Sequence, residues 1–187
     1  MRILLGATVL AALIIGIGGA GLAQSAKVET TPVPMTAKPD FSKMSFLTGT
    51  WNCSILSSRR PGPYRTTSVA SISGDGYWIL TRTTVHRASW IPRSFTSEDR
   101  MTYDPSTSRW IDMTYDDQGG YDLSTSPGWT GNSIVWTDLA YPRTNATAMN
   151  NPTTMTKVSD TKTTSSTSFK EPSGRLVTVK TTCTKGS

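Results

Sequence analysis

The sequence predicts an all-β domain, a closed antiparallel up-and-down β-barrel of about 8 to 10 strands with a short N-terminal helical plug. First, short segments rich in Thr, Val, Ile, Tyr and Trp alternate with Gly, Pro, Asp and Ser clusters, at about the 8 to 12 residue spacing of sandwiches and barrels. Second, turn signals join neighbouring segments, which favours a meander. Third, the two cysteines lie near opposite ends of the mature chain in sequence.

Residues 1–23 are predicted to be a secretory signal peptide. One positive charge, Arg2, precedes an apolar run from Ile3 to Leu22, and Gly21 and Ala23 are small residues with the spacing of a cleavage site. We expect cleavage before Gln24. An uncleaved anchor is the alternative, because about twenty largely apolar residues can span a bilayer. After cleavage, the protein is expected to be secreted or periplasmic, with no membrane span.

Residues 24–40 are predicted to be a flexible lead, because they carry three prolines and no apolar periodicity. The barrel domain is expected to occupy residues 41–187. It opens with the helical plug, for which Asp40 is the candidate N-cap. Phe41, Met44 and Leu47 recur at helical spacing, so one or two turns here would close one end of the barrel.

Ten segments have the composition of strands. They are residues 50–57, 64–73, 77–87, 94–104, 109–116, 120–126, 132–140, 153–159, 162–170 and 175–184. Gly74-Asp75-Gly76, Asp104-Pro105, Gly119-Gly120 and Pro172-Ser173-Gly174 are turn signals between consecutive strands.

Cys53 and Cys183 are the two cysteines, so an exported protein is expected to join them in a disulfide. That bond needs α-carbons about 4.4 to 6.8 Å apart. The first and last strands must therefore be neighbours, as they are in a closed barrel.

Strand alternation predicts which side chains face inward. Apolar residues recur on one face of four segments. The groups are Trp51, Cys53 and Ile55; Phe95, Met101 and Tyr103; Ile111, Met113 and Tyr115; and Val177, Val179 and Cys183. Glu98, Arg100 and Lys180 occupy opposing positions and are expected to face solvent.

The charge pattern disfavours nucleic-acid binding. The chain has 19 Lys and Arg against 13 Asp and Glu, a formal net charge of +6, but the basic residues are scattered. A phosphate backbone favours clustered cations, whereas interleaved signs are typical of a solvated surface.

The residue inventory disfavours catalysis. His86 is the single histidine, which argues against a catalytic triad or a multi-histidine metal site. Asp116 and Asp117 are adjacent and would point to opposite faces of a strand. No phosphate-binding glycine loop or hydrolase motif is present. We therefore expect no enzyme activity, no catalytic residue, no cofactor and no metal.

Six tryptophans and six tyrosines are many large rings for one β domain, and rings that line a cavity suit a small amphipathic ligand. Alternatively, they fill the core. His86 is open to two interpretations, a ligand contact inside the cavity or a residue at a strand end. The candidate ligand-binding residues are Trp51, Trp78, His86, Met101, Tyr103, Met113, Tyr115 and Trp136.

Trp90 and Ile91 lie in a predicted loop, where large apolar side chains would otherwise remain in water. They are expected either to form a portal or partner-docking loop, or to pack back over a barrel end.

The motif order resembles a known family. Phe46-Leu47 followed by Gly49-Thr50-Trp51 resembles the Gly-x-Trp signature of lipocalin and calycin barrels, in which the tryptophan closes the barrel base. The stretch 103–129 is similar to bacterial lipocalin-like domains of unknown function, through Tyr103-Asp104-Pro105, Trp110, paired glycines and Gly128-Trp129-x-Gly131.

This resemblance implies a lipocalin-like barrel with an internal cavity and small-molecule binding. Related haem barrels of the nitrobindin type ligate iron through a histidine far toward the C-terminus. The last third of this chain has no histidine, so no haem site is carried over.

We therefore expect a non-catalytic exported barrel that binds a small apolar or amphipathic molecule in its interior. The alternative is a protein-interaction scaffold with a filled barrel that presents its loops. An internal pocket of about 300 Å³ or more would favour ligand binding, and a filled interior would favour the scaffold.

Overall fold

The computed structural model describes residues 37–140 and 151–186. The chain divides into two units, Met1–Met35 and Thr36–Ser187, and every described residue belongs to the second. The predicted signal peptide, its cleavage site and most of the predicted flexible lead lie outside the described residues.

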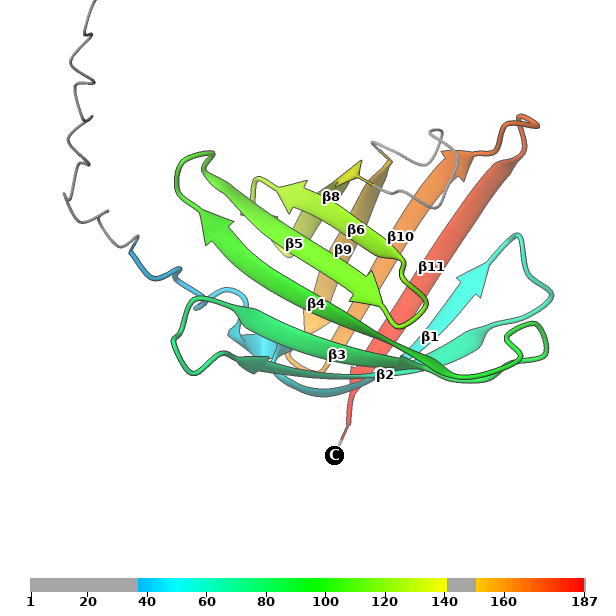
Figure 1. Cartoon of the computed structure of the whole chain (residues 1–187). Helices are drawn as coiled ribbons and strands as arrows, with labels where there is room; N and C mark the ends of the chain where they lie inside the picture. Colours follow the sequence, from blue (N-terminus) through cyan, green and yellow to red (C-terminus); the bar gives the residue numbers. More distant parts are fainter. Residues whose placement is uncertain (1–36, 141–150, 187) are drawn as a thin grey trace, which may run out of the picture. The chain divides into compact units, whose positions relative to one another are not determined.

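The described residues form a short 3-10 helix and eleven strands (Figure 1). These are η1 (Ser45–Leu47), β1 (Gly49–Ser57), β2 (Tyr64–Ile72), β3 (Ile79–Val85), β4 (Phe95–Asp104), β5 (Arg109–Asp116), β6 (Tyr121–Ser126), β7 (Trp129–Thr130), β8 (Ser133–Ala140), β9 (Pro152–Ser159), β10 (Lys162–Lys170) and β11 (Leu176–Lys185). Each of the ten predicted strands is present, with ends that differ by at most two residues from the prediction.

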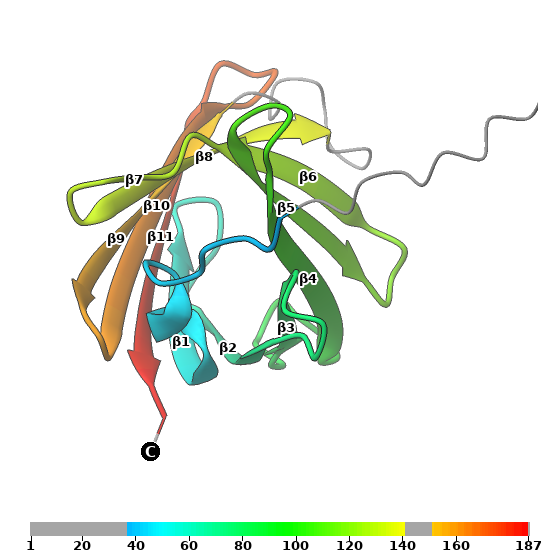
Figure 2. The same cartoon turned by 90° about the vertical axis from the view of Figure 1, so that its left-hand side faces the viewer.

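Ten of these strands close into an antiparallel barrel, so the predicted all-β class and closed antiparallel barrel are confirmed. The sheet order is β6-β5-β4-β3-β2-β1-β11-β10-β9-β8, and a further pairing of β6 with β8 closes the ring (Figure 2). The two-residue strand β7 pairs only with β8. Every pairing joins strands that are consecutive in the chain, apart from the β1–β11 and β6–β8 closures, as expected for an up-and-down meander.

The helical plug predicted over residues 41–47 is not supported. Residues 42–44 form a turn, and the only helical element among the described residues is the three-residue η1. Thr48 is already extended, because β1 begins at Gly49. So short a segment forms too few backbone hydrogen bonds to offset the cost of nucleating an α-helix.

The segment before β1 nevertheless contributes to the core. Phe41 and Met44 are buried in a cluster with Ile79, Ile134 and Trp136. Figure 2 shows the segment, in blue and cyan, at one end of the ring of strands. We call this end, which also carries the β2–β3, β4–β5 and β9–β10 turns, the base, and the opposite end the rim.

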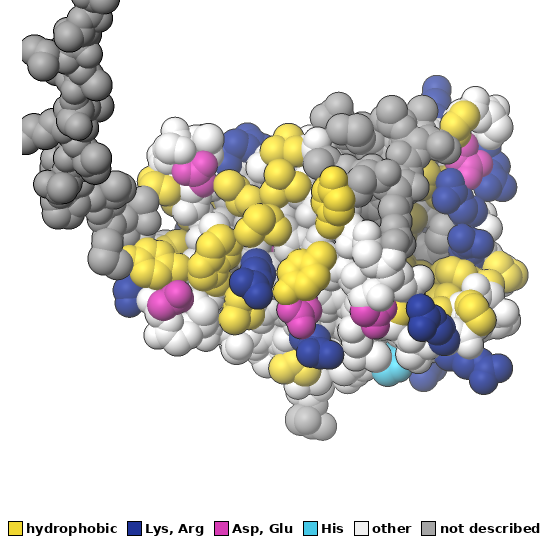
Figure 3. Space-filling model, viewed as in Figure 1, with side chains coloured by type: hydrophobic (Ala, Val, Ile, Leu, Met, Phe, Trp, Pro, Cys, Tyr) yellow, Lys and Arg dark blue, Asp and Glu magenta, His cyan; other side chains and the backbone are white. Residues whose placement is uncertain are grey.

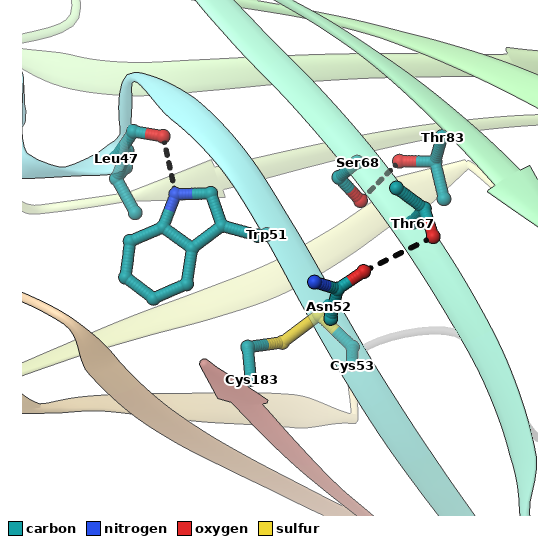
Figure 4. The surroundings of a disulfide bond; sticks show 8 residues. All are labelled: Leu47, Trp51, Asn52, Cys53, Thr67, Ser68, Thr83 and Cys183. Carbon is teal, nitrogen blue, oxygen red and sulfur yellow. Dashed lines mark hydrogen bonds between the residues drawn. A yellow bond between two sulfur atoms is a disulfide. The ribbon is translucent and has the colours of Figure 1, made fainter. Parts of the chain in front are cut away.

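The expected disulfide joins the first and last strands. Cys53 on β1 lies directly opposite Cys183 on β11, with the two α-carbons 4.0 Å apart (Figure 4). The two residues are 130 positions apart in sequence. The antiparallel pairing of β1 with β11 thus places the cysteines together.

Candidate ligand cavity inside the barrel

The barrel interior holds a cavity of about 270 Å³. Strand pairing identifies the side chains that face it, because directly opposed residues in an antiparallel pair lie on the same face. Trp51 opposes Ser68, Ser68 opposes Thr83, and the same face continues around the ring. The lining residues are Leu47, Trp51, Cys53, Ser68, Ala70, Ile79, Thr81, Thr83, Asp99, Met101, Asp112, Trp136, Met155, Thr163 and Cys183.

One wall of the cavity is apolar, and Trp51 is its best-fixed member. Its indole Nε1 donates a 2.8 Å hydrogen bond to the Leu47 carbonyl oxygen, and the side chain is 5% exposed (Figure 4). Trp136 is also buried, and Met101 and Met155 pack against the same cluster. These groups offer rings and flexible thioethers to an apolar ligand surface.

The cavity lining also carries carboxyl groups, next to Met101. Asp112 on β5 lies directly across from Met101 on β4, and Asp99 on β4 faces inward one residue pair away. The Thr114 hydroxyl donates a 2.6 Å hydrogen bond to Asp99 Oδ1, whereas Asp112 Oδ1 is buried without a hydrogen-bond partner. A carboxyl group that lacks partners in a low-dielectric interior is costly to ionise.

The pKa values of these carboxyl groups are raised. Burial raises the pKa of Asp112 to about 7, with further contributions from the charges of Asp99 and Asp122. Burial also raises the pKa of Asp99, an effect that the Thr114 hydrogen bond opposes. Asp122 has a pKa raised to about 6, first by burial and then by Asp138, whose own pKa burial raises.

A second hollow of about 300 Å³ lies at the rim, next to these carboxyl groups. Phe95, Ser97, Thr114, Asp116, Gly120, Tyr121 and Asp122 line it. Asp116 is engaged there, because its Oδ1 accepts hydrogen bonds from the backbone N–H groups of Gln118 and Gly120. Asp122 Oδ1, in contrast, is buried without a hydrogen-bond partner.

The structure brings three of the eight candidate ligand-binding residues to the cavity, namely Trp51, Met101 and Trp136. Tyr103 lies deeper toward the base. Its ring packs edge-on against Trp110, with 5.5 Å between centroids, and Trp110 in turn contacts Phe41. Tyr103 therefore belongs to the aromatic packing beneath the cavity.

Trp78 and His86 lie away from the cavity. Trp78 precedes β3 in the β2–β3 turn, where its backbone N–H donates to Ser73 Oγ. His86 follows inward-facing Val85 and reaches the outer side of the barrel, with its Nε2 2.9 Å from Thr67 Oγ1. Of its two interpretations, this geometry matches a residue at a strand end.

His86 also borders a larger groove, of about 680 Å³, on the outside of β1, β2 and β11. Its lining is mainly threonine, serine and asparagine, with Arg65. Ligand sites are usually concave and mostly apolar, with a few placed polar groups. The groove lacks the apolar wall of the internal cavity, which is why the internal cavity is the stronger candidate despite its smaller volume.

The structure reverses the predicted facing of β5. Met113 and Tyr115 were expected to face inward with Ile111, but Asp112 shares the inward face with Trp110 and Thr114. The physical reason is register. Pairing of Met101 with Asp112 turns every second residue of β5 inward from that point, and a shift of one residue would exchange the two faces.

The outer side of β5 and β6 is consequently rich in apolar groups. Met113 opposes Leu123, and Tyr115 opposes Tyr121. Tyr115 and Tyr121 are 40% and 54% exposed. Figure 3 shows hydrophobic side chains gathered over this side of the barrel.

The loop with Trp90 and Ile91 packs back onto the protein. Ile91 is 7% exposed. The Trp90 ring lies edge-on against Tyr64, with 5.1 Å between centroids, and the Arg60 guanidinium covers it at 4.6 Å. These contacts match the second of the two alternatives for this loop.

Sequence reasoning missed Asp99 and Asp112. The signal for Asp99 was present, since it lies between Glu98 and Arg100, which were assigned to solvent, and alternates with Met101. The residues around Asp112 point the other way, because its apolar neighbours Ile111 and Met113 suggest the opposite face.

Within residues 37–140 and 151–186, no group of three or more His, Cys, Asp or Glu side chains is arranged to hold a metal ion. The same residues contain no helix that is long and apolar enough to cross a membrane.

Comparisons with known proteins identify no family for this chain. No family model matches the sequence, and no curated protein matches it. Among solved structures, the chain is similar to a redesigned β-barrel at 12% identity, over 76% of this chain and 94% of the other, with a TM-score of 0.38. The function proposed next therefore depends on the residues of the barrel itself.

Proposed function

We propose that this protein is a non-catalytic, exported, lipocalin-like β-barrel that binds a small amphipathic molecule in its interior. The observation that carries the proposal is the internal cavity of about 270 Å³, whose lining is partly apolar and partly polar. Trp51 and Trp136 belong to the apolar part of the lining, and Asp99 and Asp112 belong to the polar part. A site with both kinds of lining suits a ligand with both kinds of surface.

The size of the cavity limits the ligand. Its volume lies just below the usual range for small-molecule sites, roughly 300 to 1,000 Å³. The ligand is therefore a compact molecule, smaller than a long-chain lipid.

The lipocalin-like assignment is supported by the base of the barrel. Trp51 of the Gly-x-Trp sequence lies there, fixed by its hydrogen bond to Leu47. Lys185 adds its ammonium group 5.5 Å from the Trp51 ring centroid and donates to the Phe46 carbonyl oxygen. A tryptophan that closes the barrel base is what the resemblance implies for Trp51.

Native mass spectrometry of the protein purified from its own host tests ligand binding. The wild type is expected to carry a reproducible bound mass. Thr81→Phe, which fills the cavity, is expected to lose it, whereas Thr84→Phe, on the outer face of the same strand, is expected to keep it. A bare wild-type mass, or equal binding by Thr81→Phe, would contradict the proposal.

Export has its own test. Intact-mass analysis of the protein from the host envelope and medium is expected to give a chain that begins at Gln24 and contains the disulfide. A full-length chain found only in the cytoplasm, with two free thiols, would contradict export.

The interaction scaffold remains a second candidate, favoured by one observation. The outer side of β5 and β6 exposes paired apolar side chains, including Tyr115 and Tyr121. Tyr121→Ser would then weaken capture of an envelope protein from the host, while the bound small-molecule mass stays unchanged. Loss of the small molecule without loss of a partner would favour the internal site instead.

A further inference from the structure

The carboxyl group of Asp112 is buried and incompletely hydrogen-bonded, which is unusual. It lines the cavity, and its Oδ1 is buried with no hydrogen-bond partner. Buried polar groups are nearly always paired, so an unpaired carboxylate oxygen on a cavity-lining residue marks a position where a donor is missing. A ligand that supplies that donor would remove the cost of burying the oxygen.

Three more aspartates share this side of the interior. Asp99 lies beside Asp112 on β4, Asp122 lies diagonally across on β6, and Asp138 on β8 opposes Ser124, which itself opposes Asp112. The resulting group is Asp99, Asp112, Asp122 and Asp138, which we call the acidic wall. Like charges gathered in this way favour a cation between or beside them.

Within residues 37–140 and 151–186, no salt bridge involves a residue of the acidic wall. The salt bridges there involve Glu98, Asp160 and Glu171. Two lysines lie at inward register positions, but both are engaged near the base. Lys157 pairs with Asp160, 2.6 Å away, and Lys185 donates to the Phe46 carbonyl oxygen.

The rest of the cavity defines the body of the ligand. Asp99 and Asp112 share the cavity with the rings of Trp51 and Trp136 and with the Met101 and Met155 side chains. An inorganic ion would leave that apolar wall without contacts. The described residues also hold no group of three acidic, histidine or cysteine side chains suited to a metal.

We infer that the cavity is selective for small organic monocations, with the ammonium group held by Asp112 and Asp99 and the apolar body against Trp51 and Trp136. This inference rests on the proposed function, since it names the chemical class of the interior ligand. Indole rings also favour a cation that approaches their faces. The acidic wall thus distinguishes amines from neutral or anionic molecules of the same shape.

Isothermal titration calorimetry with three matched probes tests the inference. The probes are 2-phenylethylamine, the neutral 2-phenylethanol and the anionic 3-phenylpropionate. The amine is expected to bind wild-type protein about tenfold or more tightly than the alcohol, because the ionic contact forms in a partly desolvated site. The carboxylate is expected to show no measurable binding.

Single-residue variants locate the effect. Asp112→Asn and Asp99→Asn keep the side-chain shape and remove the charge, and each is expected to reduce the preference for the amine to about two- to threefold or less. Glu98→Gln is the matched control, because Glu98 neighbours Asp99 on β4 and pairs with Arg82 on the outer face. It is expected to keep the wild-type preference.

The pH dependence supplies a readout that a purely structural role would not give. The amine probe stays protonated from about pH 5.5 to about pH 8, whereas Asp112, with its pKa of about 7, loses its proton over this range. Amine affinity is expected to rise by about tenfold across it. Asp99, Asp122 and Asp138 face Asp112 from β4, β6 and β8, and they act in the same direction.

The outcomes separate the inference from the proposed function. If the alcohol binds as tightly as the amine, cation selectivity is wrong and interior binding stands. If Asp112→Asn and Asp99→Asn retain the amine preference while near-ultraviolet circular dichroism shows them folded, the cation binds elsewhere and the inference is wrong. If no probe binds and the purified protein carries no bound mass, both are wrong.

Discussion

Asp112 faces the interior although its apolar neighbours on β5 face solvent. Burial decided residue by residue would place Ile111 and Met113 inside, since burying them removes more apolar area from water. The pairing of β4 with β5 decides otherwise, because it places Asp112 opposite Met101. The cost of the buried carboxyl group is reflected in its raised pKa.

The raised pKa of Asp112 predicts how stability varies with pH. A carboxyl group whose folded pKa lies above its unfolded value binds more protons in the folded state, so the free energy of unfolding falls as pH rises from about 4 to about 7. We expect Asp112→Asn to reduce this fall, with an upper limit of about 4 kcal/mol at pH 8. Urea unfolding at about pH 3.5 and about pH 8 measures it.

The remaining acidic wall sets the control for that measurement. Asp99, Asp122 and Asp138 also have raised pKa values, so part of the fall is expected to persist in Asp112→Asn. Glu98→Gln on the outer face is expected to follow the wild-type pH profile. An Asp112→Asn profile identical to that of the wild type would show that Asp112 carries no such cost.

Gly49 is the other residue with a clear individual role. Its φ is 101°, a conformation that L side chains rarely adopt, and a Cβ here would lie 3.1 Å from Lys185 Cε. Gly49→Ala is expected to lower the free energy of unfolding by roughly 1 to 3 kcal/mol. Denaturant titration measures the change.

The matched control for Gly49 is Gly62→Ala. A Cβ at Gly62 would have no atom within 4 Å, and the φ of Gly62 is not positive. That variant is expected to be neutral or slightly stabilising, because alanine restricts the unfolded chain. Equal effects of the two substitutions would contradict the role given to Gly49.

At the scale of elements, β1 and β11 are joined both by backbone pairing and by the disulfide. The register runs from Trp51 opposite Lys185 to Ser57 opposite Val179, with Cys53 opposite Cys183 near one end. The backbone pairing alone gives the two strands a defined register. The disulfide is therefore expected to add stability without determining the fold.

Replacing both cysteines tests this expectation. In the chain-entropy model, a loop of 130 residues gives a loss of at most about 5 kcal/mol in the free energy of unfolding. The Cys53→Ser/Cys183→Ser variant should retain the wild-type far-ultraviolet circular dichroism spectrum and unfold at lower denaturant. Wild-type protein treated with reductant should match the variant. Unchanged midpoints in both samples would contradict a stabilising disulfide.

The strands and their order could be predicted from the sequence, and the inward facing of Asp112 could not. Strand positions follow from local composition and from turn residues, such as Gly119-Gly120 and Pro172-Ser173-Gly174. Which side chains of a strand face the interior depends on how that strand pairs with its neighbour. On β5 both alternating sets contain large side chains, Trp110 on one and Tyr115 on the other, so only the partner strand decides between them.

For the segment before β1, the sequence predicted which side chains are buried but not the backbone conformation. Phe41 and Met44 have helical spacing and are buried, but the segment has only a turn and η1 before Thr48 becomes extended. The apolar pattern identified which side chains reach the core. It did not identify the backbone that brings them there, because the length available before β1 favours short turns.

For the whole molecule, closure depends on two contacts of unequal quality. The β1–β11 contact is long and covalently joined, whereas within residues 37–140 and 151–186 β6 pairs with β8 from Leu123 opposite Ala140 to Thr125 opposite Thr137, with a register irregularity and no disulfide. Asp122 and Asp138 lie at this second contact, and the charge of Asp138 raises the pKa of Asp122. Mutual repulsion between these two carboxylates therefore acts at the closure that no disulfide joins.

We therefore expect the barrel to open first at the β6–β8 contact. Backbone amides of β6 and β8 are expected to exchange with deuterium sooner than those of β1 and β11. After correction for the intrinsic exchange rate, this difference in protection should be larger at higher pH, because Asp122 and Asp138 ionise. Hydrogen–deuterium exchange followed by mass spectrometry measures it. Equal protection at both contacts would contradict it. A barrel that is covalently joined at one closure and not at the other is therefore expected to fluctuate mainly at the second closure, which lies beside Asp122 and Asp138.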